Sequence, residues 1–153
     1  MRTQVSGRVN AVVFALFITA ATAHAAPVKP CELLNPPAAS ALFGGPLQPP
    51  VEMGTMCMYS SSAGPVITSA VGPAPGSAGP DFVKAKMGAG AGDTTESVPG
   101  LGDQNLFDMR PNGWNVLTVF YQQKMLVLSV QKRMNPALKD AMIQAALKMI
   151  TKV

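Results

Sequence analysis

The sequence is poor in histidine, in charge and in long apolar runs. Its one histidine is His24, and charged residues make up 13% of the 153-residue chain. Beyond that position no imidazole is available, which excludes Ser-His and Cys-His nucleophile pairs and histidine-ligated zinc or copper sites. The apolar run from Ala11 to Ala21 is too short to span a bilayer. These absences favour a protein that is not an enzyme.

The first residues predict an export signal. Arg2 and Arg8 flank the start of the apolar run, and Ala23-His24-Ala25 has the small-x-small form of a signal-peptidase site. We predict a signal peptide at residues 1–25 and a single domain at 26–153, in a periplasmic or secreted protein. The alternative is an uncleaved membrane anchor. Cleavage would remove two of the 12 basic residues and lower the net charge from +4 to +2.

The processed chain would hold two cysteines, Cys31 and Cys57. In an oxidising compartment such a pair favours a disulfide, which would tie the first helix to the first strand. Closing this loop stabilises a fold by roughly 3–4 kcal/mol on the chain-entropy description. The alternative is a thiol or metal site. No small residue directly precedes Cys31, so lipid modification is not expected.

The stretch from Trp114 to Gln131 predicts the centre of the fold. Asn115–Tyr121 and Lys124–Val130 are rich in residues that suit strands, and the polar pair between them favours a tight hairpin. Alternation would place one wholly apolar set on one face and a mixed set on the other. The apolar set is Leu117, Val119, Leu126, Leu128 and Val130; the mixed set is Val116, Thr118, Phe120, Met125, Val127 and Ser129.

A helix is predicted directly after the hairpin. Asn135 is a suitable N-cap, Pro136 suits the first helical position, and no glycine or further proline follows up to Ile150. An apolar stripe at helical spacing would pack on the sheet. The stripe consists of Leu138, Met142, Ala145 and Met149, flanked by Ala146 and Ile150.

Weaker patterns predict the remaining elements. Glu32 to Phe43 is expected to be helical, with Leu34, Ala38, Ala41 and Leu42 on one face. Asn35 followed by proline resembles a cap and first turn within it, and Gly44-Gly45 ends the segment. Residues 72–80 and 88–103 are expected to be Gly/Pro-rich loops. Strands are predicted at 55–61, 65–71, 96–98 and 105–109, and a short helix at 81–87. Strands grouped between terminal helices indicate an α+β fold with a mostly antiparallel sheet.

Two sets of side chains could carry chemistry. Four carboxylates, Asp93, Glu96, Asp103 and Asp108, lie close together in sequence, but turn and loop roles are favoured over catalysis. Met53, Met56 and Met58 surround Cys57, and thioethers with a thiolate suit Cu(I). Packing of Met56 and Met58 in the core is favoured over copper binding. We therefore expect no catalytic residue, no cofactor and no metal.

Several short motifs resemble a known family. Cys31-Glu32-Leu33-Leu34, then Cys57-x-Tyr59, then Val98-Pro99-Gly100-Leu101-Gly102-Asp103, occur in the order found in small exported bacterial proteins, many of them actinobacterial lipoproteins. The resemblance implies a PsbP/Mog1-like α/β/α sandwich and an envelope location, and it implies no activity. The chain departs from that family in lacking a lipobox and in carrying Asn105 where a small residue is usual.

The aromatic residues of the hairpin suggest a binding surface. Trp114, Phe120 and Tyr121 could anchor a partner, although covering a sheet edge is the more common role of such residues. Basic residues are scattered, so nucleic-acid binding is not expected. We expect a monomeric, non-catalytic binding or interaction module that recognises an envelope protein or small ligand, without stable membrane insertion after signal cleavage. The alternative is a methionine-based copper protein of the periplasm.

Overall fold

A computed structural model describes residues 28–74 and 92–153 of the chain. The predicted signal peptide, the predicted helix at 81–87, and residues 75–80 and 88–91 of the two predicted loops lie outside these ranges. No helix within the described ranges is long and apolar enough to cross a membrane.

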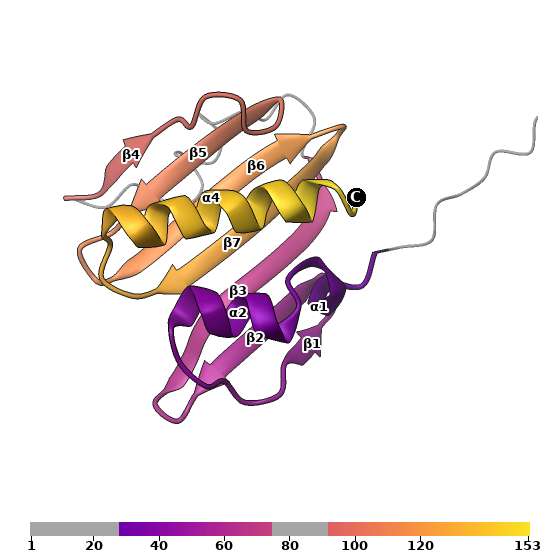
Figure 1. The fold of residues 1–153 in the computed structure, drawn as a ribbon. Helices are drawn as coiled ribbons and strands as arrows, with labels where there is room; N and C mark the ends of the chain where they lie inside the picture. Colours follow the sequence, from indigo (N-terminus) through magenta and orange to yellow (C-terminus); the bar gives the residue numbers. More distant parts are fainter. Residues whose placement is uncertain (1–27, 75–91) are drawn as a thin grey trace, which may run out of the picture.

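The described residues form one antiparallel sheet of seven strands with helices packed on it (Figure 1). The strand order is β1-β2-β3-β7-β6-β5-β4, so β1 and β4 are the edges. Strands and helices together confirm the predicted α+β class. The strands are β1 (Val51–Met53), β2 (Met56–Ser61), β3 (Gly64–Pro73), β4 (Thr94–Glu96), β5 (Gln104–Met109), β6 (Trp114–Tyr121) and β7 (Lys124–Gln131).

The central hairpin has the predicted register. Leu117 pairs with Leu128 and Val119 with Leu126, which puts the apolar set on one face as expected. The turn at Gln122 and Gln123 has positive φ angles of 46° and 63°. Left-handed backbone at both central residues gives the turn the twist that antiparallel strands favour, although glycine or asparagine usually occupies such positions.

The C-terminal helix, α4 (Pro136–Ile150), begins where the sequence predicts. The side chain of Asn135 accepts a hydrogen bond from the Leu138 N–H at 2.8 Å, and Pro136 follows it. The predicted stripe packs onto the sheet, because its four members and Ala146 are all buried. Propensity, capping and periodicity agree along this segment.

The N-terminal helical segment differs from its prediction. It is divided into α1 (Pro30–Leu33) and α2 (Pro36–Phe43), because Leu34 is extended; the predicted cap at Asn35 is confirmed as the N-cap of α2. Proline disfavours helical backbone in the residue before it, which explains the break. The predicted face is also partly wrong, since Ala39 is buried with Leu42, whereas Ala41 is exposed.

The first strands were only partly predicted. β2 and β3 match two of the predicted strands, but no strand was predicted at β1. Two prolines precede β1 and its three residues are all exposed, so burial does not alternate along this strand. Pairing with β2 is what makes it a strand.

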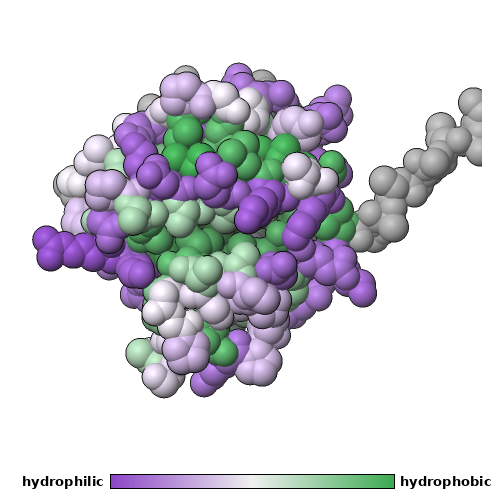
Figure 2. Space-filling model, viewed as in Figure 1, coloured by the Kyte–Doolittle hydropathy of each residue, from purple (hydrophilic) through white to green (hydrophobic). Residues whose placement is uncertain are grey.

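The main core lies between the sheet and the described helices α1, α2 and α4, which all cover the same face (Figure 1). Phe107, Leu117, Leu128 and Met142 are among its fully buried members. On the outside of the helix layer, a band of hydrophilic residues follows α4, with hydrophobic residues on both sides of it (Figure 2). This face of the sheet is called the helix face below, and the opposite one the outer face.

Candidate functional site

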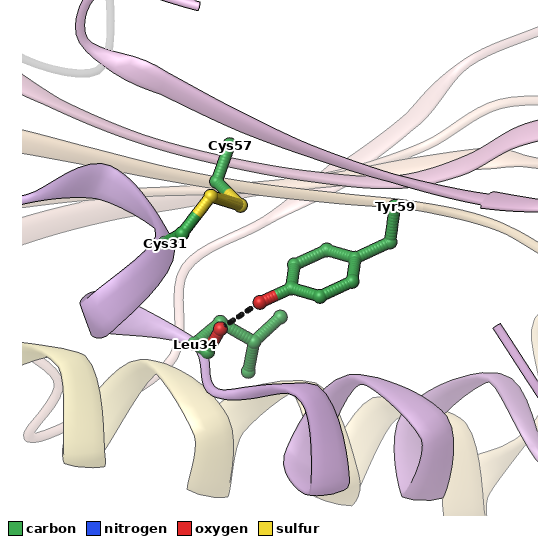
Figure 3. The surroundings of a disulfide bond; sticks show 4 residues. All are labelled: Cys31, Leu34, Cys57 and Tyr59. Atoms are coloured by element: carbon green, nitrogen blue, oxygen red, sulfur yellow. Dashed lines mark hydrogen bonds between the residues drawn. A yellow bond between two sulfur atoms is a disulfide. The ribbon is translucent and has the colours of Figure 1, made fainter. Parts of the chain in front are cut away.

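A disulfide and a tyrosine tie the N-terminal helices to the sheet (Figure 3). Cys31 of α1 is bonded to Cys57 of β2, which confirms the predicted pairing. Tyr59 projects from the same face of β2, and its hydroxyl donates a hydrogen bond to the carbonyl of Leu34. Burial raises the pKa of the Tyr59 hydroxyl. A structural disulfide is typical of an oxidising, non-cytoplasmic compartment.

Two lysines, one before and one after α4, bind the C-terminal ends of these same helices. The Lys152 ammonium donates to the carbonyls of Glu32 at 2.6 Å and Leu33 at 3.0 Å, at the end of α1. The Lys132 ammonium donates to the Phe43 carbonyl at 2.8 Å, at the end of α2. Cations at helix C-termini satisfy free carbonyls and interact favourably with the helix dipole. Two of the positive charges of the chain are therefore engaged in contacts that hold α1 and α2 in place.

Glu96, Asp103 and Asp108, three of the four carboxylates, make separate structural contacts. Glu96 forms an ion pair with Lys139 of α4, and Asp108 accepts from the Arg110 Nε at 2.8 Å. Among the described residues, no group of three or more His, Cys, Asp or Glu side chains could hold a metal ion. Glu96 and Asp108 lie in strands β4 and β5, not in the loops and turns expected for them, and Asp108 is buried.

The Gly100–Asp103 turn supports the central hairpin. Asp103 accepts a hydrogen bond from the Gln122 N–H at 2.9 Å and thus holds the left-handed turn between β6 and β7. Gly102 has φ +64°, and a Cβ there would lie 2.6 Å from the Phe120 carbonyl oxygen, so only glycine fits. The Asn105 amide donates to the carbonyls of Val98 and Leu101 at 2.8 and 2.7 Å. Gly102 and Asp103 of the family-like motif are thus explained by turn geometry, and Asn105, which departs from the family, supports the same turn.

The three aromatic residues predicted to form a binding surface do not lie together. Phe120 is 6% exposed and packs with Leu106, so it is unsuited to anchor a partner. Trp114 and Tyr121 are half-buried at opposite ends of β6 and, by alternation, on opposite faces. The surface predicted from them is therefore not one surface.

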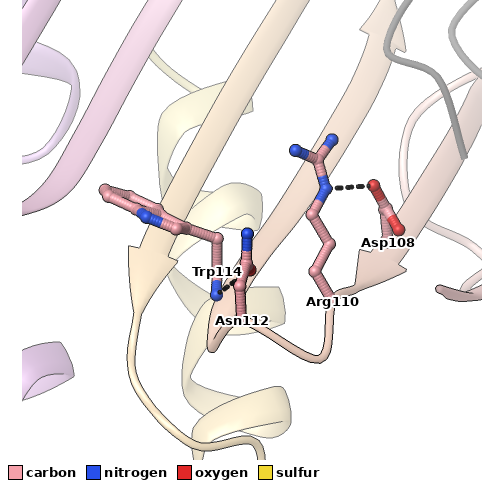
Figure 4. A network of polar contacts seen from close by, with 4 residues as sticks. All are labelled: Asp108, Arg110, Asn112 and Trp114. Carbon is pink, nitrogen blue, oxygen red and sulfur yellow. Dashed lines mark hydrogen bonds and ion pairs between the residues drawn. The ribbon is translucent and has the colours of Figure 1, made fainter. Parts of the chain in front are cut away.

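A polar pair lies close to Trp114 in sequence (Figure 4). The indole ring points away from the Arg110–Asp108 pair. The backbone N–H of Trp114 donates a hydrogen bond to Asn112 Oδ1 at 3.0 Å. Asp108 Oδ1 and Arg110 Nη2 are buried and have no hydrogen-bond partner. The turn after β5 is thus held by its own polar side chains. One acceptor, on Asp108, and one donor, on Arg110, remain without a hydrogen bond.

A groove of about 890 Å³ opens at the end of the sheet where the β1–β2 and β6–β7 turns meet the end of α4. Its walls come from five separate parts of the chain, which only the fold brings together. The residues that line it are Val28, Pro30, Gly54, Thr55, Val71, Gly72, Pro73, Gln122, Gln123, Lys124, Thr151, Lys152 and Val153.

The groove combines an apolar lining with a polar, positively charged rim. Val28, Val71 and Val153 supply apolar surface, while Gln123 and Lys124 supply hydrogen-bond donors. No aspartate or glutamate is among the residues lining it. Within the described ranges the Lys124 ammonium has neither a hydrogen bond nor an ion pair. The site can therefore accept a group with apolar surface and a hydrogen-bond acceptor or negative charge.

Sequence reasoning missed this groove, and one signal could have pointed to it. A two-residue hairpin turn without glycine or asparagine requires left-handed glutamines, and sparsely populated backbone conformations cluster at ligand sites. The rest of the lining carries no motif, because its members are ordinary residues from distant segments.

No family model matches the sequence, and no curated protein matches it.

Proposed function

We propose that this protein is an exported, non-catalytic binding module of the cell envelope that takes its ligand in the groove at the end of the sheet. The observation that carries the proposal is the groove itself, with its apolar lining, unpaired Lys124 ammonium and glutamine turn. Ligand sites are commonly concave and mostly apolar, with a few placed polar groups. The disulfide supports an oxidising location.

The chemistry of the rim narrows the ligand class. Lys124 and the Gln123 amide offer donors at the mouth of the groove, and Thr55 offers a hydroxyl from the opposite wall. Lys152 is already bonded to two carbonyls of α1, so Lys124 is the cation available to a ligand. We infer a small ligand or protein segment with an apolar body and a carboxylate or carbonyl acceptor.

The left-handed turn supports a binding role over a purely structural one. Placing a non-glycine residue in left-handed backbone costs on the order of 1–2 kcal/mol. Gln122 and Gln123 both adopt it, at the rim of the groove, and Asp103 and Ala74 hold the turn through hydrogen bonds. Asn-Gly at these positions would relieve the strain, but it would shorten the amide side chain at position 122 and remove the one at position 123.

The finer fold assignment belongs to the same proposal. The resemblance to exported bacterial proteins implies a PsbP/Mog1-like sandwich, and an antiparallel sheet with helices packed on one face is compatible with it. Export by a signal at residues 1–25 would deliver the chain to the compartment in which its disulfide forms.

Native mass spectrometry of the protein isolated from its own cell envelope tests the proposal. Thr55→Trp places a large ring in the groove, and Thr94→Trp makes the same change at an exposed position on the opposite sheet edge. We expect a bound ligand mass on wild type and on Thr94→Trp but not on Thr55→Trp. Equal ligand occupancy in all three proteins, or none in any, would contradict the proposal.

A second variant separates binding from folding. Gln122→Asn with Gln123→Gly should raise the free energy of unfolding by roughly 1–2 kcal/mol, because the turn strain is relieved. The same change should weaken ligand retention. A variant that is more stable and retains the ligand fully would place the binding site elsewhere.

A further inference from the structure

Three methionines lie together on the outer face of the sheet, at the β1 edge. The β1–β2 register pairs Met53 directly with Met56, and Met58 follows two residues later on the same strand. Directly paired residues and residues two apart share one face of a sheet. All three thioethers therefore project from the outer face.

These methionines are not core residues, contrary to the packing expected of Met56 and Met58. Met53 is 43% exposed, and the other two are half-buried. None of the three belongs to either buried cluster of the described residues. Packing in the core therefore does not account for a methionine at each of these positions.

The spacing allows the three sulfur atoms to meet. In an antiparallel pair, directly opposite Cβ atoms lie about 4.5–5.5 Å apart, and diagonal neighbours about 7–8 Å apart. Met53 and Met56 are the direct pair, and Met53 and Met58 are the diagonal one. Methionine has three rotatable side-chain bonds, so the thioethers can turn toward a common point above the strands.

The surroundings select for a soft, singly charged cation. Cys57 lies between two of the methionines but faces the core and is oxidised, so no thiolate joins the set. Thr68 and Ala70 are the β3 partners of Met58 and Met56 and bring no charge. Three neutral thioethers cannot compensate a double charge, whereas soft sulfur ligands suit Cu(I).

We propose that Met53, Met56 and Met58 bind one Cu(I) ion through their three thioether sulfurs. The site is independent of the groove at the end of the sheet, because none of its three ligands lines that groove. It requires neither the cysteines nor a histidine, which agrees with the oxidised state of the pair and with the position of His24.

Titration with Ag(I), and with Cu(I) kept reduced by ascorbate, tests the site on the disulfide-bonded protein. The methyl carbon of each methionine is followed by NMR, and Cu(I) affinity is measured against a competing chelator. We expect one ion per chain and shifts of the three methyl signals only. The buried Met142 and Met149 serve as internal controls.

Replacing the three ligands with leucine keeps their size and apolar character. The Met53→Leu, Met56→Leu, Met58→Leu variant should bind Cu(I) at least tenfold more weakly, since even outer-sphere changes cost 10–100-fold in other metal sites. Met125→Leu is the matched control, because Met125 is a half-buried methionine on the same face, opposite Gly72. Thermal unfolding of each variant confirms that it is folded.

The titration and the variants together decide whether the three methionines bind Cu(I). Shifts confined to the three methionines, and loss of binding only in the triple variant, support the site. Unchanged binding in the triple variant, equal loss in Met125→Leu, or no binding of either ion would overturn it. A triple variant that keeps its groove ligand but loses Cu(I) would show that the two sites are separate.

Discussion

The two faces of the sheet differ in what covers them. On β7, Leu126, Leu128 and Val130 point to the helix face and are at most 2% exposed. Met125 and Val127 point to the outer face and are only half-buried. One strand thus contributes to a closed core on one side and to a more accessible surface on the other.

The outer face is itself divided. Toward β5 and β6 it is closed, since Leu106 and Phe120 are 4% and 6% exposed and form a second small cluster. Toward β1 and β2 it is open, and there the three methionines lie. Stability therefore comes mainly from the helix face, while the open part of the outer face is available for binding.

Removing a side chain from each face of β7 should show the largest contrast. Leu128→Ala is expected to lower the free energy of unfolding by about 2–5 kcal/mol, because the cavity lies in a packed core. Val127→Ala changes the neighbouring residue on the outer face and should cost about 1 kcal/mol or less. Chemical denaturation of both variants measures the difference. Equal losses would mean that the outer face is as closely packed as the helix face.

Breaking the disulfide should have the next largest effect. Cys31→Ala with Cys57→Ala removes the bond between α1 and β2, and we expect a loss of about 2–4 kcal/mol. Reduction of the wild-type protein by dithiothreitol should lower its unfolding midpoint similarly and leave the double variant unchanged. If reduction does not change the wild-type midpoint, the bond does not stabilise the helix face.

Tyr59→Phe should cost about 1–3 kcal/mol, because the Leu34 carbonyl loses its buried hydrogen bond. It should also change the response to alkaline pH. The folded-state pKa of Tyr59 lies above its ordinary value of 10.0, so the unfolded state releases the proton first. The contribution of Tyr59 to the free energy of unfolding is therefore complete below its ordinary pKa. It is lost as the pH rises through the folded-state pKa.

Denaturation from pH 8 upward, with Tyr121→Phe as the control, measures this dependence. The difference in stability between wild type and Tyr59→Phe should shrink in the alkaline range. A difference that stays constant with pH would show that Tyr59 ionises alike in both states.

The smallest effect is expected for the ion pair between β4 and α4. The side chains of Lys139 and Glu96 are 35% and 34% exposed, so solvent weakens their attraction. Lys139→Ala should cost about 1 kcal/mol or less, and less still at high salt. Lys148→Ala removes an exposed lysine from the same helix and is the control. A loss above 2 kcal/mol that persists in salt would show that the edge of the helix face depends on this pair.

Local patterns predicted the second half of the chain well. The hairpin, its two faces and α4 follow from alternation, an N-cap and helical spacing, all of which are readable over short distances. The first half followed less well, because β1 is a strand only through its pairing with β2, and Pro36 divides the helical segment. The burial of Phe120 was not predicted, because it depends on packing against Leu106 of β5.

Sequence alone determined the disulfide partners, the absence of histidine beyond residue 24, and the central hairpin with its helix, since these depend on residue identity and nearby spacing. Tertiary structure alone decided which carboxylates form contacts that hold parts of the fold together, where the groove opens, and that three methionines share an open face. Those properties depend on strand register and on which segments meet in space. Local sequence patterns reveal neither the register nor the contacts between residues far apart in the chain.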